Sequence, residues 1–384
     1  MMSTTDIVYD KNGLPSSVRK QGSGLVNIAK ATSSAGYITT YDGDVAMDKT
    51  KLELGDDKDK TGVYEMTFGV TNVSGSAVSY DVDSIIMTEG VSETYTSHGD
   101  TTVTQEEYLL SGTQTTVTSV VGGTQSGNRI SLSANSTAKV TVRIVLSDAD
   151  KQYLEDSFAH GMYVEGYIKL DAVSGTNVDM NVAMLTFFGD WTEAPIFDEE
   201  YYDTQKDAIN AGIDPEDKLM ADLYDTRVIG GLYSDYITTL GDYYFEQDPS
   251  ATQIAADKKY IAISNQEDES NMTVNSIYGV WAGLLRNVKE ARISFVEDST
   301  GEEIFFKTES NVLKTFSSGN SAVASSIDID FHTLEHNLKN NTRYTVTITT
   351  YIDYGEFDKQ ANVRNTFTFP LFIDFQAPVV TDVE

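Results

Sequence analysis

Histidines are the side chains best suited to acid–base and metal chemistry near neutral pH, and the sequence has four, His98, His160, His332 and His336. The stretch His332–His336 (HTLEH) is an H-x-x-E-H pattern, which on a helix would place two imidazoles and a carboxylate on one face, able to hold zinc. Asn337–Asn341 would end such a helix quickly, and no third ligand is evident. We therefore interpret the motif as a connecting turn and expect no metal site.

No serine has the surroundings of a catalytic nucleophile. A Ser–His–Asp triad needs a histidine beside a serine on an exposed turn, and no G-x-S-x-G pattern occurs. Gly319–Ala322 (GNSA) resembles the nucleophile turn of subtilisins, but it lacks the proline that follows there and lies in a Ser/Asn-rich stretch. A loop is the better interpretation. We expect no catalytic residue, so the chain alone should not be an enzyme.

Cofactor and cation motifs are equally incomplete. Asp57–Gly62 begins like a calcium loop, but its twelfth position is Phe68, where a bidentate glutamate is needed. The acidic stretch Asn265–Glu269 could still hold a cation such as calcium. Gly22–Gly24 (GSG) is not a phosphate loop, because no strand precedes it and no lysine follows it. We expect no cofactor.

Composition limits the partners. The 384 residues include 27 basic and 59 acidic side chains, a net charge of −32, so nucleic acid and anionic membranes should be repelled. Cations and basic polypeptides remain as partners. There is no cysteine, hence no disulfide, and no apolar run approaches the roughly 20 residues of a membrane span. Residues 1–30 lack the apolar core of a signal peptide.

Alternation of apolar and polar residues dominates the chain and predicts half-buried antiparallel strands. It is clearest over Val63–Val70, Val78–Val82, Lys139–Leu146 and Arg343–Ile352. The side chains expected to face inward include Tyr64, Met66, Phe68, Val70, Val140, Val142, Ile144, Leu146, Tyr344, Val346 and Ile348.

Helical signals are few and short. Ser147–Phe158 starts with a good N-cap and an acidic first turn, and Ile213–Tyr224 is a second candidate. Strands alternating with long helices are absent, which argues against a doubly wound fold. The fold class we expect is mostly β, with two tandem β-sandwich domains, short helices and an aromatic-rich connector over 197–255 that wraps the second domain.

The boundary between the sandwiches is expected near Trp191–Phe197. Just before it stand Phe187, Phe188, Gly189, Asp190 and Trp191, whose rings supply large apolar area. This cluster could fix one domain against the next. An ordinary core cluster is the alternative.

Five stretches, in this order, resemble cell-envelope subtilisin-like serine proteases (subtilases) of the lactocepin and streptococcal complement-cleaving peptidase type. Residues 2–31, with Q-G-S-G-L-V-N, are similar to the tail of their catalytic domain, and Asp150–Leu170 to the late part of their first fibronectin type III-like domain. Residues 187–191 (FFGDW) resemble that domain's closing motif. Residues 261–286 and 370–378 resemble the next domain, although the first of these lacks the family's Pro and both Gly, which leaves any turn or ion role open.

The resemblance implies three parts. Residues 1–33 would be a residual tail of a catalytic domain, marked by Gln21, Gly22, Gly24 and Leu25, and 34–196 and 197–384 would be two fibronectin type III-like sandwiches. It also implies a non-catalytic accessory region of a secreted serine endopeptidase at the cell surface or cell wall, a monomer serving as spacer and scaffold and in substrate presentation. Its partners would be an upstream catalytic domain, in contact within the same polypeptide, and polypeptide substrates. Separated from that domain, the tail should make few local contacts.

Two other functions stay open. A freestanding surface adhesin or carbohydrate-binding module would use exposed aromatic side chains in the stretch Tyr201–Tyr244 to stack on sugars. The third hypothesis is an autonomous hydrolase, and the missing nucleophile argues against it. Catalytic motifs encoded upstream of Met1 would favour the protease role, and a signal peptide encoded there would favour the adhesin.

Overall fold

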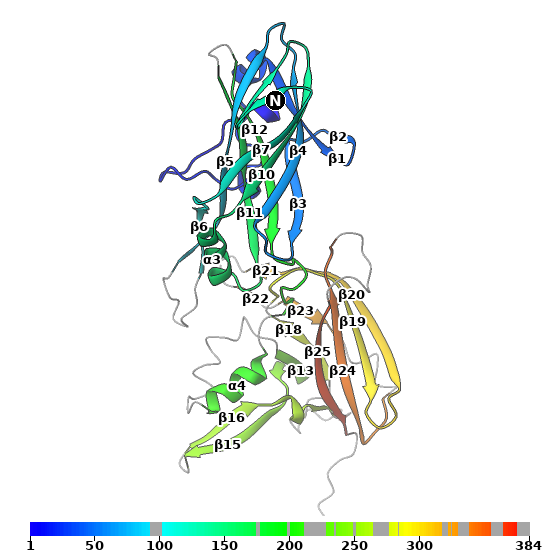
Figure 1. Cartoon of the computed structure of the whole chain (residues 1–384). Helices are drawn as coiled ribbons and strands as arrows, with labels where there is room; N and C mark the ends of the chain where they lie inside the picture. Colours follow the sequence, from blue (N-terminus) through cyan, green and yellow to red (C-terminus); the bar gives the residue numbers. More distant parts are fainter. Residues whose placement is uncertain are drawn as a thin grey trace, which may run out of the picture. The chain divides into compact units, whose positions relative to one another are not determined.

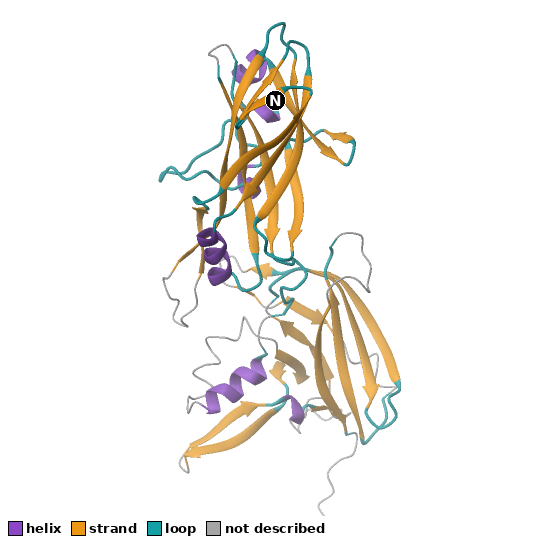
Figure 2. Cartoon of the chain, viewed as in Figure 1, coloured by secondary structure: helices purple, strands orange, loops and turns teal. Residues whose placement is uncertain are grey.

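The chain folds into two compact units, Met1–Ala194 and Pro195–Glu384, and both are built mostly from strands (Figures 1 and 2). The division falls two residues before the expected boundary at 196/197. A computed structural model describes residues 1–384 except 93–101, 174–176, 198–199, 211–227, 234–235, 249–250, 264–275, 283, 317–321, 324, 329–337, 355–363 and 375–384.

The first unit contains two sheets. The five-stranded sheet has the order β2-β1-β4-β10-β7, all antiparallel. Its strands are β1 (Gly36–Asp42), β2 (Val45–Met47), β4 (Val63–Asn72), β7 (Gln114–Val121) and β10 (Thr137–Val145).

The second sheet has the order β3-β12-β11-β5-β9-β8, with β6 also paired to β5. Only β3 runs parallel to its neighbour, β12. The strands are β3 (Lys51–Asp57), β5 (Val78–Ser92), β6 (Thr102–Leu109), β8 (Thr124–Ser126), β9 (Arg129–Leu132), β11 (Met162–Ala172) and β12 (Met180–Phe188).

The core of this sandwich lies between the two sheets and follows the sequence alternation. In β4 the side chains of Tyr64, Met66, Phe68 and Val70 are buried, as predicted. In β10 those of Val140, Val142 and Ile144 are buried as well. One core cluster joins these residues to inward-facing ones of the second sheet, such as Tyr80, Ile168 and Met184. The strands predicted in the first unit are therefore confirmed.

The hairpin of β8 and β9 covers one edge of the five-stranded sheet. Its turn residue Asn128 accepts a hydrogen bond from the Val117 amide at 3.0 Å and donates one to the Thr115 carbonyl at 2.9 Å. Gln125 donates to the Val117 carbonyl at 2.6 Å. Because β7 is the last strand of its sheet, these side-chain amides occupy backbone groups with which a further strand would pair.

Helices of the first unit are short: η1 (Met2–Thr4), α1 (Val18–Gln21), α2 (Ile28–Ser33) and α3 (Asp148–Ser157). The α3 helix confirms the predicted helical segment. Ser147 is its N-cap and accepts a hydrogen bond from the Asp150 amide, while the Asp150 carboxylate bonds back to the amide of Ser147, forming a capping box. Among the described residues, no helix is long and apolar enough to cross a membrane.

The second unit carries a five-stranded sheet of order β17-β25-β24-β19-β20 and a four-stranded sheet of order β14-β13-β18-β23. The strands are β13 (Val228–Tyr233), β14 (Tyr236–Thr239), β17 (Ala262–Ile263), β18 (Ser276–Ala282), β19 (Val288–Glu297), β20 (Glu303–Val312), β23 (Ser325–Asp328), β24 (Thr342–Tyr351) and β25 (Arg364–Ile373). Two hairpins, β15 (Asp242–Asp248) with β16 (Ala251–Ala256) and β21 (Thr315–Phe316) with β22 (Ala322–Val323), complete it with η2 (Lys258–Tyr260).

Burial in the second unit again follows the alternation. Tyr344, Val346 and Ile348 of β24 are fully buried, which confirms the strand predicted over Arg343–Ile352. The helix α4 (Tyr201–Asn210) was not predicted, and the predicted helix over Ile213–Tyr224 lies outside the described residues.

Candidate binding surface on the first unit

Residues 1–34, here called the N-terminal segment, pack on the outer face of the second sheet. Tyr167 of β11 and Ala183 of β12 are fully buried although they lie on that outer face, and Met87 of β5 is buried with them. Val18 of α1, which is 4% exposed, completes this small apolar cluster. The expectation that the segment makes few local contacts is therefore wrong.

Arg19 provides the strongest polar contact of the segment. Its backbone amide and its Nε each donate to the Glu165 carboxylate at 2.9 Å, and its guanidinium also pairs with Glu89. The guanidinium carbon lies 4.4 Å from the centre of the Tyr163 ring, a cation–π contact. Burial lowers the pKa of Arg19, but the Glu165 charge and hydrogen bond outweigh it and raise the pKa. Since the side chain of Glu165 is 1% exposed, loss of Arg19 would leave a buried carboxylate unpaired.

Glu107 of β6 makes a second buried contact. Its Oε1 accepts hydrogen bonds from the Ser17 amide at 2.9 Å and from Lys20 Nζ at 2.7 Å. Burial alone would raise the pKa of Glu107, but the Lys20 and Ser17 hydrogen bonds lower it further than burial raises it. The carboxylate is therefore held in its charged form by the N-terminal segment.

The residues singled out as a catalytic-domain tail fold the segment on itself, and one of them bonds to the sandwich. Gln21 accepts a hydrogen bond from the Val8 amide at 2.8 Å and donates to the Ser16 carbonyl at 2.6 Å. Gly22 has a φ of +62°, and its carbonyl accepts the Tyr167 hydroxyl hydrogen bond at 3.2 Å. These residues thus fold the segment back on itself and onto β11.

Gly24 has a stricter requirement. Its φ is +116°, and a Cβ there would lie 2.4 Å from the carbonyl oxygen of Asp6. The close approach allows Leu25 and Asp6 to exchange backbone hydrogen bonds of 2.8 and 2.9 Å. Leu25 itself is 65% exposed, and Val26 and Ile28 are also more than half exposed. These three apolar side chains are therefore not part of the cluster around Val18.

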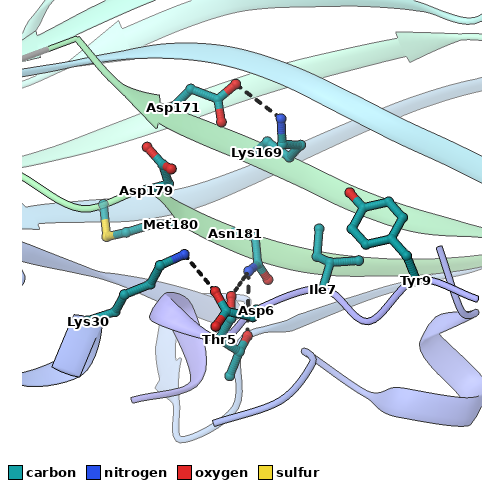
Figure 3. A pocket seen from close by; sticks show the side chains of 10 residues that line it. All are labelled: Thr5, Asp6, Ile7, Tyr9, Lys30, Lys169, Asp171, Asp179, Met180 and Asn181. Carbon is teal, nitrogen blue, oxygen red and sulfur yellow. Dashed lines mark hydrogen bonds and ion pairs between the residues drawn. The ribbon is translucent and has the colours of Figure 1, made fainter. Parts of the chain in front are cut away.

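A polar cavity of about 250 Å³ lies where the segment meets β11 and β12 (Figure 3). Figure 3 shows Lys30 directed toward Asp6, at 2.6 Å, and Lys169 toward Asp171, at 3.1 Å. Asn181 donates to the Thr5 carbonyl at 2.9 Å, and its Oδ1 is buried with no hydrogen-bond partner. The two lysines are thus each paired with an aspartate, and Asn181 links the segment to the sheet. We therefore do not interpret the cavity as a ligand site.

The boundary cluster is divided between two faces of β12. Phe188 belongs to the main core and is 1% exposed. Phe187 lies on the opposite face, with its ring centre 5.1 Å from that of Trp191 and 5.4 Å from that of Tyr163. Asp190 pairs with Lys58 at 2.8 Å.

The turn that follows β12 depends on a glycine and on a hydrogen bond from a backbone amide to a side chain. Gly189 has a φ of +131°, and the Trp191 amide donates to Asp56 at 3.0 Å. Both cluster faces thus lie within the first unit, and a role between domains stays a prediction.

Of the residues considered for catalysis and metal binding, the structure describes His160 and the Asp57–Gly62 turn. His160 is exposed, and the remaining three histidines, Asn265–Glu269 and Gly319–Ser321 lie outside the described residues. Asp57 accepts hydrogen bonds from the amides of Thr61 and Gly62, so it closes a turn. In the described part of the chain, no three His, Cys, Asp or Glu side chains are placed to hold a metal ion.

Two tyrosines considered for sugar stacking are not accessible. Tyr201 is 5% exposed and Tyr202 is fully buried, with its hydroxyl bonded to the Leu240 carbonyl at 3.0 Å. Neither can present a ring face to a carbohydrate.

Sequence reasoning did not identify Arg19, Lys20, Glu107 and Glu165 as contact residues. Charged side chains at the outward positions of a strand are normally solvated, and their spacing alone carried no other meaning. One signal was present: Tyr167 occupies an outward position between Glu165 and Lys169, and a large ring there indicates that something covers the sheet.

The fold of the first unit is a two-sheet β-sandwich with a covered outer face. Residues 52–183 match the family model of an Fn3-like domain, which makes this region fibronectin type III-like and leaves the N-terminal segment and β1 outside the match. No curated protein matches the sequence closely enough to count as a relative.

Among solved structures, the PapD-like domain of human CEP192 is 10% identical, with 44% of this chain and 94% of that chain covered and a TM-score of 0.25. The class 5 fimbriae chaperone CfaA is 10% identical, with 83% and 96% covered and a TM-score of 0.23. A family 123 glycoside hydrolase from Clostridium perfringens is 10% identical, with 42% and 29% covered and a TM-score of 0.22. Likenesses this weak indicate no function.

Proposed function

We propose that the chain is a non-catalytic accessory region of a secreted, cell-surface subtilisin-like serine endopeptidase, in which it is a spacer and scaffold and helps to present polypeptide substrates. The observation that carries this proposal is the attachment of the Q-G-x-G-L stretch. In the resembled family this stretch belongs to the tail of the catalytic domain. Here the Gly22 carbonyl accepts a hydrogen bond from Tyr167 of β11, and Gln21 and Gly24 fold the stretch against Val8 and Asp6 of the same segment. A domain joined ahead of it would therefore be connected through a folded, docked segment.

Two further properties support a scaffold. Residues 52–183 match an Fn3-like domain, a β-sandwich that hosts many binding and spacing roles. The net charge of −32 attracts cationic polypeptides over distances of about 10 Å at 0.1 M salt, which suits a region that gathers protein substrates near a protease.

The test is made on the natural full-length protein. Its gene is read upstream of the codon for Met1 for the D-S/T-G, H-G-T-H and G-T-S-M motifs, and the protein is treated with a fluorophosphonate probe. We expect one labelled serine in a preceding domain and none in the chain described here. A gene with a signal peptide directly upstream and no such motifs would sink the proposal and favour an adhesin.

The scaffold role has its own variant. Arg19→Met in the full-length protein should leave casein cleavage unchanged at moderate temperature and speed its loss on heating, because the buried Glu165 carboxylate loses its ion-pair partner. Lys58→Met, which removes the exposed pair with Asp190, is the matched control and should behave like the wild type. Equal heat inactivation of the two variants would show that the segment does not support the catalytic domain.

A further inference from the structure

One stretch of β4 has an edge to which no strand is paired. β1 pairs with β4 from Gly36↔Asn72 to Thr39↔Gly69 and then leaves it to form a hairpin with β2 (Figure 1). From Phe68 back to Val63, in the described chain, β4 is paired only with β10, which lies on its other side. The free edge therefore runs along Val63–Phe68.

Two hydrogen bonds fix which backbone groups face this edge. The Asn72 amide donates to the Ser136 carbonyl at 2.8 Å, so the even-numbered residues of β4 bond toward β10. The Val73 amide donates to the Ala35 carbonyl at 2.8 Å, so the odd-numbered residues bond toward β1.

Thr67 and Glu65 are the next odd-numbered positions after the β1 pairing ends. Both direct their N–H and C=O groups into the free edge. Val63, the following one, already uses its N–H on the Thr61 hydroxyl at 3.2 Å. Two residues of β4 therefore remain available for strand pairing, and they continue the β1–β4 ladder without a change of register.

A groove of about 330 Å³ lies along this same stretch, between β4, β3 and the β1–β2 hairpin. Its floor is apolar, because Leu52 and Met66 are 6% and 3% exposed and Leu54 packs beside them on the core. The edge and the groove thus offer backbone hydrogen bonds and an apolar surface at one place.

The rim of the groove is charged, and on the β3 side its basic and acidic side chains pair with one another. Lys49 and Lys51 each lie 2.6 Å from the Glu53 carboxylate. Their hydrogen bonds, that of Lys49 first, hold the pKa of Glu53 below its ordinary value. The other charged side chains that line the groove, Asp42 and Glu65, are acidic, so acidic flanking side chains are disfavoured in anything that enters.

We infer that the free edge of β4 binds a short extended polypeptide segment as an added strand. Two residues of that segment exchange backbone hydrogen bonds with Thr67 and Glu65, and their side chains point to solvent. The residue between them lies opposite Met66, and its side chain points to the groove floor, so it is apolar. This surface belongs to the sandwich itself and does not depend on the proposed role in a protease.

The probe is the peptide Ser-Thr-Val-Thr-Ser-amide with fluorescein on its N-terminal amine, and its valine is the inward residue. Binding to the whole chain is measured by fluorescence anisotropy. N-methylation of the two threonines removes the N–H groups that face β4 and should weaken binding by about tenfold or more, whereas N-methylation of the valine, whose N–H faces solvent, should change it little. Valine→aspartate in the peptide should abolish binding.

The matched protein variants are Thr67→Pro and Thr67→Val. Proline removes the outward N–H without touching the β10 ladder and should weaken peptide binding by about tenfold, while valine keeps the N–H and should leave it unchanged. The methylated peptides keep the test decisive should Thr67→Pro fail to fold. Absent binding, or equal loss with either methylation, overturns the inference. Self-association of the chain that Thr67→Pro abolishes would also overturn it, by assigning the edge to a second copy.

Discussion

The five-stranded sheet of the first unit has exposed strand edges on two sides, at β7 and at β4, and the backbone groups of these edges are protected differently. At β7, backbone groups on the outer edge are occupied by the side-chain amides of Asn128 and Gln125. At β4, Thr67 and Glu65 lie beyond the end of the β1 pairing and beside an apolar groove. An unprotected edge strand invites association with another chain. One side of this sheet is therefore closed by local side chains, and the other is left able to pair.

The difference teaches that edge protection here is a property of particular residues and not of the sandwich as a whole. Both strands contain several β-branched residues and run antiparallel to β10. What separates them is a two-residue hairpin turn that places Asn128 against β7, whereas the β1–β2 hairpin turns away from β4.

The largest effect should come from opening the closed edge. Asn128→Ala leaves the Val117 amide and the Thr115 carbonyl without their partners and should lower the free energy of unfolding of the first unit by about 2–3 kcal/mol. Urea denaturation measures this, and ultracentrifugation should detect new self-association. The control is Asn12→Ala, an exposed amide that contacts Glu106. A loss equal to that of the control would mean that the hairpin does not protect β7.

Hydrogen exchange should separate the two edges in the wild type. The amide of Val117 is bonded to Asn128 and should exchange at least about tenfold more slowly than those of Thr67 and Glu65. The amides of Met66 and Phe68, which face β10, should be slow and serve as internal references. Equal protection at Val117 and Thr67 would show that something already covers the β4 edge.

A smaller effect is expected from Thr67→Pro alone. Because the lost N–H is not part of a ladder, the free energy of unfolding should fall by about 1 kcal/mol or less, from backbone strain and the lost hydroxyl. Thr67→Val reports any contribution of the hydroxyl, which lies 2.9 Å from that of Thr141. A loss well above that of Asn128→Ala would indicate that Thr67 pairs with β1 after all.

The smallest effect concerns acid. The pKa of Glu53 is lowered by its hydrogen bonds to Lys49 and Lys51, so its contribution to stability is present above the unfolded value and disappears as pH falls through the folded one. Glu53→Gln should therefore slightly flatten the decline in stability between about pH 5 and pH 3, whereas Asn128→Ala, which removes no titrating group, should lower stability equally at both. A steeper decline in Glu53→Gln would contradict the pairing.

The strands could be predicted from the sequence because burial on one face imposes a period of two, as in β4, β10 and β24. Helix α3 was also predictable, since its cap and first turn are local. Neither the docking of Arg19 on Glu165 nor the bond from Asn181 to Thr5 could be found this way. Their partners stand 146 and 176 residues apart, and no local pattern reports such a distance.

The roles of the residues at the two strand edges could not be predicted from the sequence for a different reason. Asn128 and Gln125 read as an ordinary polar turn, and only the position of their hairpin against β7 reveals what the amides do. Likewise, Thr67 and Glu65 belong to a strand that was predicted correctly, but the point at which β1 leaves it depends on tertiary structure.

The distance from Thr5 to Asn181 also has a consequence during synthesis. Thr5 is made first and its partner comes 176 residues later, a delay of roughly 9–35 s at about 5–20 residues per second. For most of this interval Arg19 has no completed β11 to contact, since Glu165 is made shortly before Asn181. The N-terminal segment therefore cannot complete its contacts with the sheet until Asn181 has been synthesised, and until then it is accessible to chaperones and proteases.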